Sequence, residues 1–498
     1  MTSSGLRIGG RLLGGLVAVA AGAALVWGAV LLPDADTEAA AGTDGVRIDP
    51  VAVGQQRVCQ GPLLRVGDLG GQNATAISSF GAPSLISNAG GSVGPLQDVD
   101  TASGSGATST LVQSAADAAT LAAAQAQIAD EPDQAGLAVA GCAESTASSW
   151  LLGGATDTGR TTLLLLANPS GVDSTVDVSL FTTDGAIEAP GLSDLVVAPG
   201  SQRILSLAGF APGTSALAVH VESRGGLVVP ALQTSIVRGL EPGGVDLIGA
   251  TGTPSTDQAI PGLRISTADL AAARARVGGS TDVGTALRVF VPGDEETLVT
   301  IGVTSDTPGA PGATFDAEIG PGIVADIPLD SLADGTYTVS VQSEAPVIVA
   351  ARAAAVAQPD PDSEAADQEI AYEVIDGGPL DESVVAGQRI DIAWFVSAPV
   401  LGEKVAVAVA DAPSPRLTVT AVSGESASVR LVAEDGEQVV VEVAAGSTAS
   451  VDVPANRVFQ VEGADGTVAA VSYAGEGLLA ATPLRPASQL ASPITIYR

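Results

Sequence analysis

The chain has 498 residues and a formal charge of −35 at pH 7, and 46% of its residues are hydrophobic while only 3% are aromatic. This length is too great for one hydrophobic core and predicts about three or four domains. A surface this acidic repels nucleic acids and anionic lipid headgroups, so both are poor partners.

An uncharged stretch over residues 12–32 is the first predicted element. As a helix it is long enough to cross the roughly 30 Å hydrocarbon core of a bilayer. Arg7 and Arg11 precede it and acidic residues follow it, which is the charge asymmetry of a helix whose N-terminus stays in the cytoplasm. The sequence therefore predicts a cytoplasmic segment at 1–11, a transmembrane helix at 12–32 and an extracytoplasmic remainder that starts with an acidic tether at 33–44.

The alternative interpretation of this stretch is a signal peptide. Ala39 to Ala41 offer small side chains for cleavage, which would release a secreted protein. The apolar run is longer than the core of a usual signal peptide, about 7–15 residues, and this favours a retained single-pass anchor in the cell membrane. Under both interpretations, most of the chain lies outside the cytoplasm.

Residues 45–149 are predicted to form an N-terminal extracytoplasmic region. It contains Cys59 and Cys142, which are the 2 cysteines of the chain. An even pair in an oxidising compartment predicts one disulfide, which on the chain-entropy model stabilises the fold by about 4–5 kcal/mol. Within the region, the alanine-rich spacing from Leu111 to Asp130 predicts a helix, and Pro132 bars its continuation.

From residue 150 onward, short apolar or alternating runs separated by turns predict strands. Over 150–248, about seven such runs follow one another, with turns roughly every 8–12 residues, which is typical of an immunoglobulin-like β-sandwich. The same order recurs over 285–357 and 370–498, which predicts tandem domains. The predicted fold class is mainly β: an N-terminal transmembrane helix, a disulfide-stapled N-terminal region and tandem immunoglobulin-like β-sandwiches.

Two linkers separate the predicted sandwiches. Residues 249–284 include a predicted short helix that starts at its N-cap, Thr267, and runs to Val277. Residues 358–369 are acidic and contain prolines, which predicts an extended, solvated chain. Trp150 and Trp394 precede the first and third units, and both are predicted to anchor cores rather than to stack on sugars.

No pattern in the chain predicts catalysis. His220, the only histidine, is expected on the solvated face of a strand, because apolar residues alternate with it. Gly90 to Gly94 has the spacing of a nucleophile elbow around Ser92, but loop residues flank it on both sides. Lys404, the only lysine, lacks the serine that a Ser–Lys dyad needs one helical turn before it.

Motifs for cofactors and metals are also missing from the sequence. The 56 acidic residues single out no carboxylate pair for a glycosidase, and the patterns for dinucleotides, phosphates, zinc and calcium are absent. The sequence therefore predicts no catalytic residue, no cofactor and no metal, and Cys59 with Cys142 is its only assigned site.

Several motifs together resemble a known group of proteins. They are Arg57 to Pro62 (RVCQGP), Trp150 to Gly154 (WLLGG) and, from Leu163, the run LLLLANPSGVDSTVDVSLFTTDG. In these motifs the chain resembles an actinobacterial family, a domain of unknown function, of single-pass, β-rich cell-envelope proteins. The resemblance covers nearly the whole chain, implies a membrane-anchored envelope location without known catalytic activity, and transfers no functional residues.

The expected function is that of a membrane-anchored structural or interaction protein of the cell envelope, which scaffolds a membrane complex or contacts wall polymers. Its expected partners are the membrane, through residues 12–32, and a membrane protein or a cell-wall polymer, with no nucleic acid. It is not expected to be an enzyme. Two alternatives stay open: an envelope enzyme that acts on glycans through carboxylates that no motif identifies, and a secreted adhesin or ligand-binding module.

Overall fold

In the computed structural model, the chain divides into two compact units. The structure describes residues 46–48, 54–67, 75–90, 92–98, 100, 108–115, 120–238, 241–266, 268, 283–307, 309–310, 312–329, 332–357, 389–403, 405–486 and 494–496. The first unit comprises residues 1–52 and 489–498, and its described strands, β1 (Val46–Ile48) and β35 (Ile494–Ile496), form an antiparallel pair. The second unit comprises residues 53–488 and holds the other described strands.

Strands dominate the described ranges, which confirms the prediction of a mainly β fold. The helices whose bounds the structure gives are two 3₁₀ helices, η1 (Pro190–Leu192) and η2 (Leu207–Gly209). No helix in the described ranges is long and apolar enough to cross a bilayer. The predicted transmembrane helix, acidic tether, short helix after Thr267 and acidic linker at 358–369 lie outside the described residues.

The first sheet pair consists of two five-stranded sheets. One has the order β11 (Ser148–Leu152), β17 (Ala218–Gly225), β13 (Ser174–Thr182), β14 (Gly185–Ile187), with β15 (Leu195–Val197) also paired to β13. The other has the order β19 (Glu241–Ile248), β18 (Val229–Arg238), β12 (Arg160–Asn168), β16 (Ser201–Ser206), β7 (Gln97–Asp98). Burial alternates along β13, because every second side chain points into the core between the two sheets.

The second sheet pair shares one long strand, β25 (Gly335–Val356). Its first half pairs with β20 (Ser255–Ile265) and β22 (Thr297–Ser305), and its second half pairs with β21 (Ala286–Phe290) and β26 (Ile390–Val396). β23 (Ala313–Ile319) pairs with β22, and β24 (Val324–Pro328) pairs with β21. A strand that passes from one sheet to the other closes a corner of the core. β20 lies within the segment expected to be a linker.

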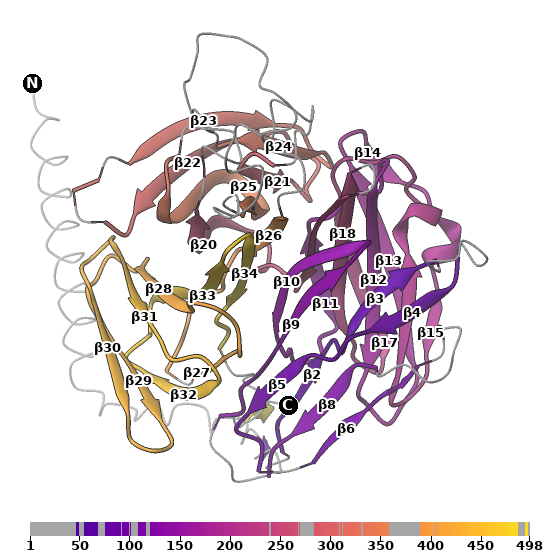
Figure 1. Ribbon diagram of the computed structural model, residues 1–498, viewed down its shortest axis with the longest axis horizontal. Coiled ribbons are helices and arrows are strands. Elements are labelled where there is room, and N and C mark those ends of the chain that lie inside the picture. Colours follow the sequence, from indigo (N-terminus) through magenta and orange to yellow (C-terminus); the bar gives the residue numbers. More distant parts are fainter. Residues whose placement is uncertain are drawn as a thin grey trace, which may run out of the picture. The chain divides into compact units, whose positions relative to one another are not determined.

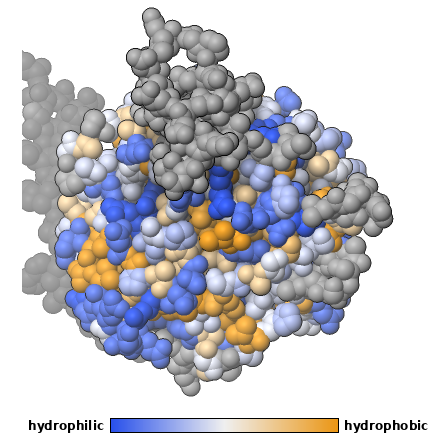
Figure 2. Space-filling model, in the orientation of Figure 1, coloured by the Kyte–Doolittle hydropathy of each residue, from blue (hydrophilic) through white to orange (hydrophobic). Residues whose placement is uncertain are grey.

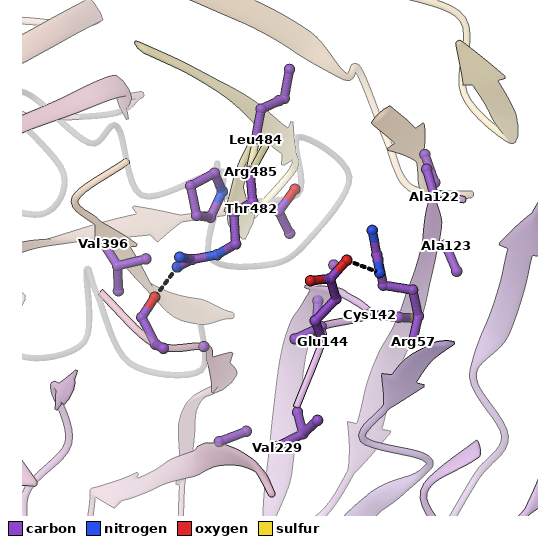
Figure 3. A pocket seen from close by; sticks show the side chains of 18 of the residues that line it. Arg57, Ala122, Ala123, Cys142, Glu144, Val229, Val396, Thr482, Leu484 and Arg485 are labelled. Atoms are coloured by element: carbon purple, nitrogen blue, oxygen red, sulfur yellow. Dashed lines mark hydrogen bonds and ion pairs between the residues drawn. The ribbon is translucent and has the colours of Figure 1, made fainter. Parts of the chain in front are cut away.

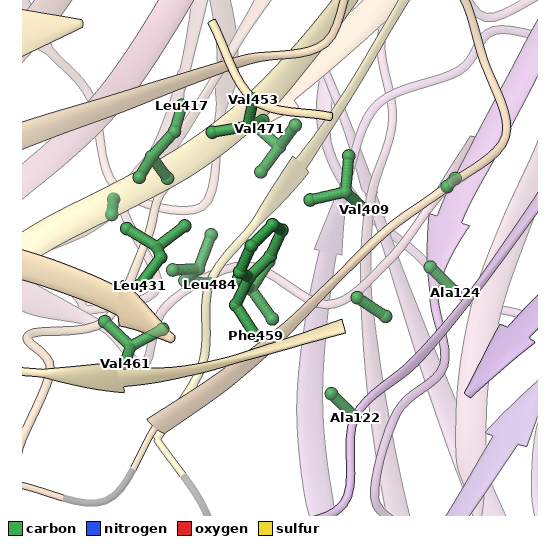
Figure 4. Close-up of a cluster of buried hydrophobic side chains, with 14 of the residues drawn as sticks. Ala122, Ala124, Val409, Leu417, Leu431, Val453, Phe459, Val461, Val471 and Leu484 are labelled. Carbon is green, nitrogen blue, oxygen red and sulfur yellow. The ribbon is translucent and has the colours of Figure 1, made fainter. Parts of the chain in front are cut away.

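The third sheet pair consists of two four-stranded sheets. Their orders are β27 (Val405–Val409), β32 (Arg457–Glu462), β29 (Ala427–Ala433), β30 (Gln438–Val443), and β31 (Thr448–Asp452), β28 (Arg416–Ala421), β33 (Thr467–Gly475), β34 (Leu478–Pro483). The core between them contains Phe459 and Tyr473. Ala122 and Ala124 of the N-terminal region pack against the same core, as Figure 4 shows.

The N-terminal region forms three small sheets. They have the orders β2 (Gln56–Cys59), β8 (Thr110–Gln113), β6 (Val93–Pro95); β3 (Leu63–Val66), β4 (Ile77–Phe80); and β10 (Gln134–Gly141), β9 (Ala123–Glu131), β5 (Ser84–Ser87). Cys59 at the end of β2 and Cys142 just after β10 form a disulfide, which confirms the predicted pairing. This disulfide joins two of the three small sheets.

The helix predicted from Leu111 to Asp130 is wrong, because strands β8 and β9 occupy its described ends. Ala124 and Ala126 are buried against the third sheet pair, and their small side chains let the two sheets approach closely. On the other face of β9, the Gln125 amide pairs with both the N–H and the carbonyl oxygen of Gly61. Packing and these bonds override the helical preference of alanine.

Buried glutamines join the N-terminal region to the first sheet pair: Gln202 of β16 accepts a hydrogen bond from Ser109 N at 2.9 Å, and Gln233 of β18 binds Leu64. Gln233 of β18 accepts a hydrogen bond from Leu64 N at 2.8 Å and donates one to Leu64 O at 2.6 Å. β7 extends the contact by pairing in parallel with β16. The main chain of β3 is therefore satisfied by a side chain of a distant strand.

We expect Gln233→Ala to lower the free energy of unfolding by about 1–3 kcal/mol, because Leu64 N loses its partner while Leu64 O keeps the hydrogen bond from Gln134 Nε2 at 3.0 Å. Urea denaturation of the purified protein measures this change. Gln438→Ala, at the exposed start of β30, is the matched control and should change stability by less than about 0.5 kcal/mol. Equal stability of the two variants would contradict the role given to Gln233.

Candidate functional site

Four strands from four different sheets meet within the second unit. β10 and β26 each contact both β19 and β34, so the four close a ring, and each is an edge strand of its own sheet. β10, β26 and β34 can be seen beside one another in Figure 1. We call these four the inner strands. The innermost strands of β-propeller blades surround their channel in a comparable way.

The carboxylate of Asp391 connects all four inner strands. Its Oδ2 accepts hydrogen bonds from Leu137 N of β10 at 2.8 Å and from Leu479 N of β34 at 2.9 Å. Its Oδ1 accepts bonds from Val245 N of β19 at 3.4 Å and from Ile392 N of β26 itself at 3.0 Å. Asp391 is 0% exposed, so these amides replace the water that an exposed carboxylate would bind.

A second buried carboxyl group lies on the neighbouring inner strand. Asp246 of β19 accepts hydrogen bonds from Leu247 N at 2.8 Å and from Trp394 N of β26 at 2.7 Å. Burial raises the pKa of Asp246 to about 8, against the lowering effect of these two bonds. Burial, with a smaller contribution from Asp246, raises the pKa of Asp391 well above its ordinary value.

Glycine is required where two inner strands approach Asp391. At Gly136 (φ +148°) a Cβ atom would lie 2.2 Å from Asp391 Oδ1. At Gly244 (φ +119°) it would lie 2.6 Å from Ile392 N. Both residues also have positive φ angles, which residues with a Cβ atom rarely adopt. The close approach of the strands therefore depends on these two residues.

A cavity of about 360 Å³ lies at one end of the inner strands, and we call it the inner-strand cavity. Leu247 and Trp394, whose amides bind Asp246, are part of its wall. Most of the remaining wall is made of small apolar residues of β10, β19, β26, β27 and β34 and of the segments that follow them. Figure 3 shows the side chains that face it.

Charged groups stand on two sides of the inner-strand cavity (Figure 3). On one side, Arg57 Nη1 forms an ion pair with Glu144 Oε1. Arg57 is only 8% exposed, and burial lowers its pKa, although Glu144 acts in the opposite direction. On the other side, Arg485 donates a hydrogen bond from Nη2 to the carbonyl oxygen of Ala250.

Arg485 has no counter-charge in the described part of the chain. Its bond to Ala250 uses one of the five N–H donors of the guanidinium, and no described carboxylate forms an ion pair with it. Burial alone lowers its pKa to about 10. The cavity therefore holds one cation that is neutralised by Glu144 and one that is not.

Gln60 is a lining residue with one unsatisfied polar atom. The residue is 6% exposed. Its Oε1 accepts no hydrogen bond in the described part of the chain and is closed to solvent, so it offers no contact to an occupant of the cavity.

The residues singled out in the sequence lie elsewhere. His220 of β17 stacks on Trp150, with ring centroids 4.1 Å apart, and its Nε2 lies 2.9 Å from Ser148 Oγ. No described carboxylate hydrogen-bonds to this histidine, so the pair lacks the third member of a catalytic triad. Its pKa is lowered by burial, against the effect of Glu222.

Of the other sequence candidates, Ser92 is not a lining residue of the cavity. Ser92 donates a hydrogen bond to Gln113 and is followed by strand β6 rather than by the helix that a nucleophile elbow needs. Lys404 lies outside the described residues. Trp394 is 5% exposed, as expected of a core anchor, and it also lines the cavity. In the described ranges no group of His, Cys, Asp and Glu side chains could hold a metal ion.

Exposed apolar side chains do not offer a second candidate site. Figure 2 shows apolar residues in several groups with polar residues between them on the face in view. The large exposed ones come from separate strands and turns; they include Val93, Val172, Val196, Leu298, Val400 and Val440. Single apolar residues of this kind are normal on a protein surface.

Comparisons with known proteins give a family but no activity. Residues 99–454 match the model of DUF5719, described as a family of unknown function. No protein with a curated description matches the chain. The crystal structure of Thermotoga maritima 1070 is 17% identical over 20% of this chain and 80% of that one, with a TM-score of 0.17. A tetra-tandem repeat of a large adhesion protein is 14% identical over 91% and 96%, with a TM-score of 0.11. Both TM-scores are too low to show a shared fold.

The buried carboxyl groups predict how stability depends on pH. Because the pKa of Asp246 is higher in the folded state than in the unfolded state, its contribution to stability is present below about pH 4 and is lost as pH rises to about 8. We expect Asp246→Asn to reduce the loss of unfolding free energy between pH 5 and pH 8 by roughly 3 kcal/mol. Denaturant titrations at the two pH values measure it.

The control for this pH dependence is Asp435→Asn. Asp435 is exposed and its hydrogen bond with Arg457 lowers its pKa, so it stays ionised from pH 5 to pH 8. This variant should keep the pH dependence of the wild type. The same dependence in Asp246→Asn as in the wild type would show that Asp246 is already ionised at pH 5.

Proposed function

The chain belongs to DUF5719, a family of unknown function, and from the inner-strand cavity we propose that it is a membrane-anchored binding protein of the cell envelope. The observation that carries the proposal is a cavity whose wall is fixed by buried hydrogen bonds and contains an uncompensated cation. Cavities with a mostly apolar wall and a few convergent polar groups are typical ligand sites. The partner is a membrane protein of the same envelope or a wall polymer, of which only a small group can enter a cavity of this volume.

Binding rather than catalysis fits the chemistry of this cavity. Glu144 is the only carboxylate among its described lining residues, and it is paired with Arg57. A glycosidase needs two carboxyl groups across its site, and the described lining has no histidine or free thiol to act as base or nucleophile. The glycan-acting enzyme, the first alternative from the sequence, therefore finds no support at this cavity.

Two further observations support the extracytoplasmic location in this proposal. The Cys59–Cys142 disulfide is of the kind that persists in oxidising compartments. The sequence of residues 12–32 has the length and flanking charges of an outward-facing anchor. In this proposal the three sheet pairs are immunoglobulin-like sandwiches, which occur in many cell-surface proteins.

We expect the cavity to be needed for capture of the partner. Gly249 lines it, and a Cβ atom there meets no other atom within 4 Å, so Gly249→Trp can fill the cavity without a backbone clash. Cross-linking in the native cells followed by purification should recover a membrane protein or wall polymer with the wild type and lose most of it with Gly249→Trp. Gly402→Trp is the matched control, since it has the same free space outside the cavity. Equal capture by all three chains would contradict the proposal.

Deletion of residues 1–32 tests the anchor separately. The wild type should sediment with membranes at its full mass, and the shortened chain, carrying a foreign export signal, should be soluble outside the cytoplasm. A mature wild-type chain that begins after Ala41 and is found in the medium would contradict the membrane anchor. It would support the second alternative, a secreted adhesin or ligand-binding module, which the same cavity also favours.

A further inference from the structure

The polar groups of the inner-strand cavity restrict the charge of its occupant. Arg485 is a fixed cation with free N–H donors, so the group that faces it must be an anion. A planar carboxylate matches the fork of a guanidinium, with two parallel hydrogen bonds. Glu144 is also part of the wall, and it would repel a doubly charged phosphate more strongly than a single carboxylate.

The rest of the wall restricts the body of the occupant. Most lining residues are Ala, Val, Leu, Ile and Pro, so the body that contacts them must be apolar. A volume of about 360 Å³ is at the lower end of ligand cavities, which limits the occupant to a small molecule or a short chain end.

We infer that the inner-strand cavity binds a small monocarboxylate with an apolar body, held by Arg485 at its carboxylate. This inference rests on the proposed function and specifies the chemistry of the occupant. The same chemistry is present in a free acylated amino acid and at the C-terminus of a peptide.

Isothermal titration of the full-length protein in detergent micelles tests the inference, with N-acetyl-L-leucine as the probe. We expect one molecule to bind per chain. N-acetyl-L-leucinamide has the same shape without the charge. It should bind at least tenfold more weakly, because it leaves Arg485 without an anion.

Two variants with opposite expected effects exclude misfolding as the cause. Arg485→Gln should weaken the binding of N-acetyl-L-leucine by about 10- to 100-fold, the usual range for a charge-assisted hydrogen bond. Glu144→Gln should strengthen it severalfold, because it removes the negative charge from the wall and leaves Arg57 free to attract the anion. Arg430→Gln, whose side chain is 50% exposed on β29, is the matched control and should have no effect.

The outcomes separate this inference from the proposed function. Three results would each overturn the carboxylate assignment: no binding of N-acetyl-L-leucine, equal binding of N-acetyl-L-leucinamide, or an unchanged affinity in Arg485→Gln. In each case, loss of the captured partner in Gly249→Trp would still support a binding protein. Acetyl-Gly-Gly-Leu identifies the source: binding at least as tight as that of N-acetyl-L-leucine supports a peptide C-terminus, and exclusion of the peptide supports a free carboxylate.

Discussion

The structure depends on one carboxylate that accepts hydrogen bonds from four strands. Three of the donors to Asp391, on Leu137, Val245 and Leu479, lie 254, 146 and 88 residues away in the sequence. A buried carboxylate without its partners is far more costly than one that is fully hydrogen-bonded. The four sheets must therefore be in place together, and partial assemblies leave Asp391 without most of its partners. This couples segments that the sequence presents as separate units.

The same constraint explains why the N-terminal region is not an appendage. It supplies β10, one of the four inner strands, and its alanines complete the core of the third sheet pair. Buried Arg288 makes a similar connection between the first two sheet pairs, because it binds Asp326 of β24 and the carbonyl oxygen of Gly154 at once. Its guanidinium also lies over the Trp394 ring, at 4.6 Å. Residues 53–488 accordingly form one compact unit rather than domains that move on linkers.

Local sequence patterns were sufficient for many strands after residue 150 and for the disulfide, because these depend on alternation, turn residues and compartment. They failed where distant contacts decide the outcome. Alanines from Leu111 to Asp130 favour a helix in isolation, and only the third sheet pair makes them a strand. Asp246 and Asp391 had a usable signal, since each is a single acid between apolar residues of a buried strand, Val245-Asp246-Leu247 and Ile390-Asp391-Ile392. Arg485 stands in an unremarkable segment, and only the ring of inner strands brings it to the cavity.

An anion site in so acidic a protein requires that local contacts outweigh the net charge of −35. Surface charges act over a Debye length of about 8 Å at physiological salt, so most of the acidic surface is screened from a group inside the cavity. Arg485 is only partly exposed, so its attraction for a group in the cavity is screened less than that of a surface charge. The acidic surface should slow the approach of anions in general, whereas the cavity retains those whose shape also fits. Since the wall is made by all four inner strands, an occupant stabilises the whole unit and not one sheet pair.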